Sequence, residues 1–147
     1  MKKIRSNESG FTLVELLASI IILSIIILGI FQMFIFSAKT ATSNQTKLVT
    51  THLAKATIER IKVDAESYFS FDQVEVGNTK IFDKENCTAR DCELFTMTVN
   101  DLSYEVEIEV SQDSAEKDLN LINVIVTVTQ PEKKLSSKLE GYVVDEE

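Results

Sequence analysis

The chain has 147 residues, a formal net charge of −8 and 44% hydrophobic residues. This length suits one modest globular domain with an appendage. The acidic balance argues against direct nucleic-acid binding, because affinity for phosphates comes from Lys and Arg side chains that release counterions.

The N-terminal part of the chain contains a long apolar run. Residues 11–36 carry one charged side chain, that of Glu15. As a helix this run would be about 39 Å long, against about 30 Å for the hydrocarbon core of a bilayer. The run therefore predicts a transmembrane helix, with the lipid bilayer as its surroundings.

Charge is distributed unevenly on the two sides of this run. The first ten residues carry Lys2, Lys3 and Arg5 against Glu8, whereas the chain from Phe11 onward has 12 basic and 22 acidic residues. An excess of Lys and Arg keeps its end of a membrane helix in the cytoplasm. We therefore expect a single-pass protein of the cell membrane, with a cytoplasmic N-terminus and an extracellular C-terminal domain.

Two simple interpretations do not account for this N-terminus. A cleaved secretory signal has an apolar region of about 7 to 15 residues and a small-x-small cleavage site, but this run is longer and its nearest match, residues 41–43, is poor. A plain membrane anchor leaves Glu15 unexplained, since a carboxylate inside a membrane helix costs on the order of 2 to 3 kcal/mol.

A third interpretation rests on the sequence GFTLVE, residues 10–15. With its basic leader and the apolar run that follows, it resembles the prepilin leader of type IV pilins and type II secretion pseudopilins. The resemblance implies cleavage after Gly10 by a prepilin peptidase, N-methylation of the new Phe11 amine, and assembly into a helical filament. It implies other pilin subunits, the peptidase and the membrane assembly machinery as partners.

This interpretation gives Glu15 a role in assembly. Glu15 lies four residues after Phe11, about 6 Å further along a helix axis. A neighbouring subunit offset by a similar rise would place its Phe11 amine beside this carboxylate, and two charges in apolar surroundings stabilise each other. The simpler alternative is that Glu15 favours its own helix N-terminus through the helix dipole.

Residues 37–68 are expected to continue as an amphipathic helix. The stretch 37–50 is small and polar without Gly or Pro, and apolar residues then recur at spacings of four, three and four. Such spacing places them on one face of a helix. These residues are Ala54, Ile58, Ile61 and Ala65.

The rest of the chain, residues 69–147, has the patterns of a small antiparallel sheet with a variable loop. Residues 104–110 alternate strictly between apolar side chains and glutamates, residues 93–99 predict a hairpin partner, and residues 121–130 predict a central strand. The stretch KLEGYVV after Pro131 predicts a fourth strand. The expected fold is therefore α+β and pilin-like, with a long N-terminal helix packed on three to four strands.

Two connections between these elements are expected to be loops. Residues 70–86 are predicted to be irregular, with a turn at Gly77-Asn78. Residues 111–120 form a polar stretch whose Asp113, Glu116 and Asp118 lack a calcium-loop spacing, so a solvated loop is expected. No metal site or cofactor is expected.

The chain has two cysteines, Cys87 and Cys92. Outside the membrane a disulfide between them would close a short loop and stabilise the domain by roughly 2 kcal/mol. Zinc would need further ligands, and the one histidine, His52, lies on the predicted helix. We therefore expect a disulfide.

No enzyme is predicted, because the chain has no phosphate-binding glycine loop and no histidine near the thiols. The chain divides into a leader (1–10), an apolar helix half (11–36), an amphipathic helix (37–68) and a sheet domain (69–147). The expected function is that of a structural subunit, a minor one, of a type IV pilus or pseudopilus. The alternatives are a Gram-positive competence pseudopilus for DNA uptake, a type II secretion pseudopilin, and a membrane-anchored binding module that never polymerises.

Overall fold

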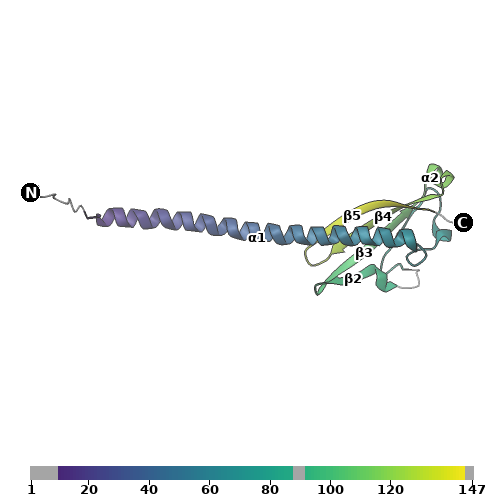
Figure 1. The fold of residues 1–147 in the computed structure, drawn as a ribbon, viewed down its shortest axis with the longest axis horizontal. Helices are drawn as coiled ribbons and strands as arrows, with labels where there is room; N and C mark the ends of the chain where they lie inside the picture. Colours follow the sequence, from purple (N-terminus) through teal and green to yellow (C-terminus); the bar gives the residue numbers. More distant parts are fainter. Residues whose placement is uncertain (1–9, 88–91, 145–147) are drawn as a thin grey trace, which may run out of the picture. The chain divides into compact units, whose positions relative to one another are not determined.

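The computed structural model describes residues 10–87 and 92–144 (Figure 1). The chain divides into two compact units, Met1–Ala41 and Thr42–Glu147. Of the expected leader only Gly10 lies within the described residues.

One long helix, α1, spans Leu13–Val63. Its residues from Thr42 onward belong to the second unit, where they lie against a sheet (Figure 1). The predicted apolar stripe is buried in full: Ala54, Ile58, Ile61 and Ala65. Three threonines that the predicted apolar stripe did not include are buried on the same side: Thr46, Thr50 and Thr57.

The helix ends at Val63, earlier than residue 68, where the sequence pattern placed its end. The carboxylate of Asp64 accepts hydrogen bonds from the backbone N–H of Ser67 (3.3 Å) and from its hydroxyl (2.6 Å). A side chain that bonds nearby backbone in this way offers the chain an alternative to the helix. A turn follows, in which Tyr68 and Phe69 donate backbone hydrogen bonds to the carbonyl of Ala65.

The second unit contains a five-stranded antiparallel sheet, which confirms the α+β prediction. The strand order is β1-β3-β4-β5, and β2 also pairs with β3. The strands are β1 (Thr79–Phe82), β2 (Thr96–Val99), β3 (Leu102–Ser111), β4 (Leu121–Gln130) and β5 (Leu135–Val144). The sheet therefore has more strands than the three to four expected.

The additional strand, β1, lies in the stretch 70–86 that the sequence pattern assigned to a loop. A 3₁₀ turn, η1 (Phe71–Gln73), precedes it. The four residues of β1 pair with the end of β3, and Phe82 faces the core with 0% exposure. A strand this short carries too few alternating residues to be recognised from its own sequence, so the pairing with β3 decides its conformation.

The predicted strand at residues 93–99 is shorter than expected. Residues Cys92–Phe95 form a 3₁₀ turn, η2, and only Thr96–Val99 are extended. The predicted hairpin with β3 is present, and both residues of its turn, Asn100 and Asp101, have positive φ angles of 52° and 61°. Such angles fit a two-residue hairpin turn.

The predicted alternation of β3 is confirmed. Tyr104, Val106, Ile108 and Val110 are buried, whereas Glu105 is exposed and Glu107 and Glu109 are partly exposed on the other face. Strand β4 is central, as predicted, and buries its residues on the helix side. Aromatic rings from outside these two strands complete the core: Phe69 stacks on Phe82, with ring centroids 5.8 Å apart.

The polar stretch 111–120 contains a short helix, α2 (Ser114–Asp118). The Asp113 carboxylate accepts a hydrogen bond from the backbone N–H of Glu116, and the Glu116 carboxylate accepts one from the backbone N–H of Asp113, both at 2.7 Å. This reciprocal pair is a capping box. The two carboxylates serve local structure, and no group of three metal-ligating side chains occurs within residues 10–87 and 92–144.

Strand β5 approaches α1 closely at Gly141. A Cβ atom built on Gly141 would lie 2.8 Å from Cγ2 of Ile58. That methyl group is attached to a β-branched side chain, which has few alternative rotamers and cannot easily move away. Gly141 thus permits the contact between this part of the helix and the sheet.

We expect Gly141→Ala to lower the free energy of unfolding by about 1 to 3 kcal/mol, because the added methyl overpacks the interface. Urea unfolding of the detergent-solubilised chain, followed by near-ultraviolet circular dichroism, measures this. Ser136→Ala, at an exposed position of the same strand, is the matched control. Adding Ile58→Ala to Gly141→Ala should cost less than the sum of the single changes, and strict additivity would contradict the explanation.

Candidate functional site

The residues predicted to direct processing and assembly lie at the start of α1. Gly10 and Phe11 precede the helix, and Glu15 lies in its first turn. All three are exposed, Phe11 by 82%. Both the proposed cleavage position and the proposed charged partner are therefore accessible.

Thr12 caps the N-terminus of this helix. Its backbone carbonyl accepts hydrogen bonds from the backbone N–H groups of Glu15 (3.1 Å) and Leu16 (3.2 Å), and its hydroxyl oxygen accepts a further one from Glu15 at 3.3 Å. Sequence reasoning missed this role of Thr12. The signal was present, since a threonine three residues before a glutamate is the spacing of a capping box.

The carboxylate of Glu15 has no ion-pair partner among the described residues of the chain, whose two ion pairs are Lys62–Glu59 and Lys138–Glu109. A negative charge in the first turn of a helix is stabilised by the exposed backbone N–H groups. The position of Glu15 in the first turn fits the simpler explanation, and both explanations of its charge stay predictions.

The surface that follows Glu15 is apolar and exposed. The large hydrophobic side chains from Leu13 to Phe36 are between 43% and 78% exposed. The hydroxyls of Ser19 and Ser24 donate to the carbonyls of Glu15 and Ile20, both at 2.7 Å, so these polar groups are satisfied inside the helix. By length and composition α1 can cross a membrane. An apolar surface of this extent marks contact with lipid or with other proteins.

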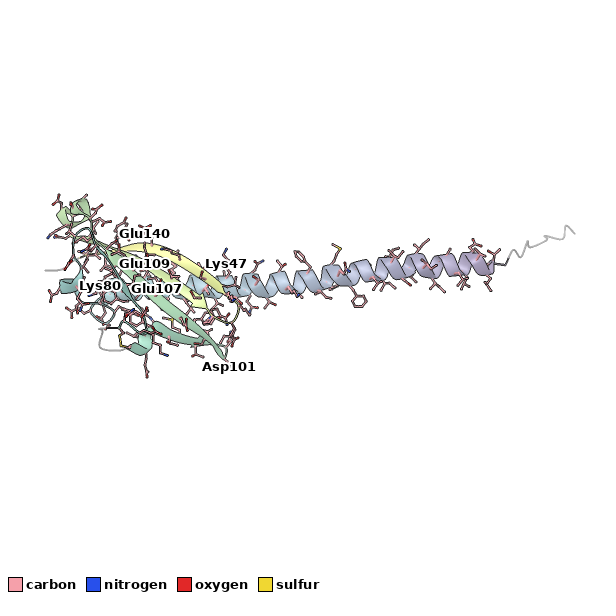
Figure 2. All side chains as sticks on the ribbon, turned by 180° about the vertical axis from the view of Figure 1, so that it is seen from behind. Lys47, Lys80, Asp101, Glu107, Glu109 and Glu140 are labelled. Atoms are coloured by element: carbon pink, nitrogen blue, oxygen red, sulfur yellow. A yellow bond between two sulfur atoms is a disulfide. The ribbon has the colours of Figure 1, made fainter. Side chains whose placement is uncertain are left out.

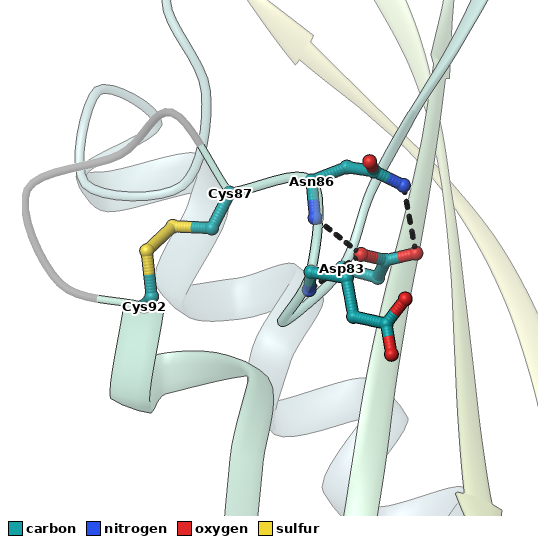
Figure 3. The surroundings of a disulfide bond; sticks show 5 residues. Asp83, Asn86, Cys87 and Cys92 are labelled. Carbon is teal, nitrogen blue, oxygen red and sulfur yellow. Dashed lines mark hydrogen bonds between the residues drawn. A yellow bond between two sulfur atoms is a disulfide. The ribbon is translucent and has the colours of Figure 1, made fainter.

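A disulfide joins Cys87 and Cys92, as predicted, with their Cα atoms 5.6 Å apart (Figure 3). The turn before it is held by Asp83, whose carboxylate accepts hydrogen bonds from the backbone N–H groups of Glu85 (2.8 Å) and Asn86 (2.7 Å). The disulfide therefore continues an ordered turn that leaves β1. It belongs to the second unit, whereas the processing residues belong to the first.

The face of the sheet opposite the helix is acidic. Glu105, Glu107 and Glu109 lie on it. The Glu109 carboxylate forms an ion pair with the Lys138 ammonium group, with Oε2 and Nζ 3.1 Å apart. Figure 2 shows Glu107 and Glu109 on β3 and Glu140 on β5, the two strands that pair with β4 on either side. This arrangement is that of a solvated strand face with one cross-strand ion pair.

Comparison with known proteins adds one finding to this geometry. Residues 5–31 match the family model of the prokaryotic N-terminal methylation motif, the leader signature of type IV pilins. The match includes Gly10, Phe11 and Glu15, and it supports a pilin-like or pseudopilin-like subunit. No curated protein and no solved structure matches the chain.

Proposed function

We propose that this chain is a structural subunit of a type IV pilus or a related pseudopilus. It inserts into the membrane, is cleaved after Gly10, is N-methylated at Phe11 and then polymerises. The observation that carries the proposal is the methylation motif at residues 5–31, placed at the start of a helix whose apolar side chains are exposed.

The contacts of Glu15 support a role in subunit registration. Its backbone N–H is bonded to Thr12, and its exposed carboxylate has no ion-pair partner among the described residues. In the filament this carboxylate pairs with the Phe11 amine of a neighbouring subunit. The pair satisfies two charges that would otherwise be buried without a partner.

The direction of insertion follows from charge and from the disulfide. The leader with Lys2, Lys3 and Arg5 stays in the cytoplasm, where the prepilin peptidase cleaves it. The Cys87–Cys92 disulfide suits the oxidising conditions outside the cell. The sheet domain is therefore the exported part, and it is displayed on the filament surface.

Within the filament the chain is expected to be a minor subunit. The segment THLAKATIERIK, residues 51–62, resembles the corresponding part of minor pilins and pseudopilins. The ratio of this chain to the other subunits in isolated filaments measures this directly.

The proposal is tested by shearing filaments from the cells that make the protein and analysing them by mass spectrometry. We expect the chain in the filament fraction, beginning at an N-methylated Phe11. A chain that stays in the membrane and never enters filaments would instead be a membrane-anchored binding module. A filament chain beginning at Met1 would contradict the processing step.

A further inference from the structure

The interface between α1 and the sheet changes character along the helix. Four apolar residues are buried in its later part, and we call them the apolar contact: Ala54, Ile58, Ile61 and Ala65. In its earlier part the buried helix residues are Thr46 and Thr50, while Val49 and Leu53 are only partly buried. The two parts of the interface are therefore held by different interactions.

Hydroxyl groups join the earlier part of the helix to β5. The hydroxyl oxygen of Ser137 lies 2.7 Å from that of Thr50 and 3.0 Å from that of Thr51. In the turn between β4 and β5, the ammonium group of Lys133 donates a hydrogen bond to the hydroxyl of Thr46 at 2.9 Å. We call these residues the polar contact: Thr46, Thr50, Thr51, Lys133 and Ser137.

The threonine hydroxyls of the polar contact keep a partner when the helix leaves the sheet. Each donates a hydrogen bond of 2.9 to 3.1 Å to a carbonyl of its own helix, that of Thr42 for Thr46 and that of Lys47 for Thr50 and Thr51. Ser137 has one hydroxyl proton, so it donates to one neighbour at a time. Water replaces that single hydrogen bond, and the polar contact therefore adds little to the docking of the helix.

Gln130 favours separation, because it is buried without a full set of hydrogen-bond partners. It is the last residue of β4 and follows Val128, the partner of Ser137, by two residues on the same buried face. Gln130 is 0% exposed, and its Oε1 accepts a hydrogen bond from the backbone N–H of Lys133 at 2.6 Å. Its Nε2 has no partner among the described residues. An unpartnered buried donor shifts an equilibrium by roughly five- to 150-fold, and access of water removes this cost.

We propose that the earlier part of the docked helix, residues 42–51, separates reversibly from the sheet while the apolar contact stays closed. The apolar contact is a pivot, because opening it would expose Ile58 and Ile61 to water and break the close packing of Ile58 on Gly141. The helix before Ala54 then leaves the sheet at more than one angle without losing its own backbone hydrogen bonds. Local openings of this kind need less free energy than global unfolding. The inference concerns the second unit alone and does not depend on the function proposed above.

Thiol labelling of the folded full chain in detergent tests the separation. Both native cysteines are in the disulfide, so an introduced cysteine is the one free thiol. Thr50→Cys places it in the polar contact and Thr57→Cys beside the apolar contact, and both threonines are 0% exposed. A maleimide should react at least about tenfold faster with the Thr50→Cys chain, and this rate should depend little on urea. Equal rates with the same steep dependence on urea would show that only global unfolding exposes either thiol, and would overturn the proposal.

Two further substitutions distinguish the contacts in these cysteine backgrounds. Ile58→Ala weakens the apolar contact, so it should speed the labelling of Thr57→Cys more than about tenfold and leave that of Thr50→Cys unchanged. Ile58→Val should show the same selectivity with a smaller factor. Equal acceleration at both positions would overturn the pivot.

Gln130→Met replaces the unpartnered amide by an apolar group of similar shape. It should slow the labelling of Thr50→Cys about fivefold or more, because the closed state no longer buries an unsatisfied donor. The backbone N–H of Lys133 loses its acceptor, but this residue is exposed and its N–H can bond to water. An unchanged or faster rate in the Gln130→Met chain would overturn the role given to Gln130.

Discussion

Gly10→Val is expected to abolish processing and leave a full-length, membrane-inserted chain that does not enter filaments. The proposed cleavage follows Gly10, and a peptidase that requires glycine there would be blocked by a branched side chain. A Cβ atom added at Gly10 meets no atom within 4 Å, so the substitution leaves the packing of the chain unchanged. A loss of processing would therefore reflect recognition by the peptidase and not a change in the fold.

The measurement is the mass of the mature N-terminus together with the distribution of the chain between membrane and filament fractions. Gly29→Val is the matched control, because a Cβ atom at Gly29 also meets no atom within 4 Å. It should be processed like the parent. Normal cleavage of the Gly10→Val chain would show that the peptidase does not require Gly10.

Glu15→Leu is expected to insert into the membrane at least as well as the parent, since it removes the one charge of the span. Assembly should fail, because the Phe11 amine of the neighbouring subunit loses its partner. Breaking a buried pair in this way costs about 3 to 5 kcal/mol per subunit. The helix start should persist, since Thr12 bonds the backbone N–H of residue 15 and not its side chain.

The test compares membrane and sheared-filament fractions of Glu15→Leu, Glu15→Asp and the parent. Aspartate keeps the charge and shortens the reach, so it should assemble better than leucine. In a minor subunit the defect would appear as exclusion of this chain while filaments of other pilins persist. Equal incorporation of all three chains would contradict the pairing and leave Glu15 only the role of stabilising its own helix.

The candidate site could be predicted from local sequence because its chemistry is local. Gly10, Phe11 and Glu15 lie within six consecutive residues, and the apolar run after them has the composition of a membrane helix. The capping role of Thr12 follows from the same short stretch and could also have been predicted. The two cysteines are five positions apart, so a local turn is enough to bring their thiols within bonding distance.

The regular elements with long patterns were also predictable. The stripe Ala54 to Ala65 and the alternation of β3 repeat often enough to indicate which face is buried. Short elements could not be predicted: β1 has four residues, and three of the seven residues expected to be strand at 93–99 lie in a 3₁₀ turn. Their conformations depend on partners that are distant in the sequence.

The amino-acid sequence by itself determined the apolar helix, the motif at its start, the helix-then-sheet order and the cysteine loop, because each is encoded by neighbouring residues. Only the tertiary structure decided that β1 and β2 share one edge of β3 and that Gly141 permits the close contact with Ile58. These features join residues far apart in the chain. Strand pairing and side-chain packing bring such residues together, and no local periodicity records them.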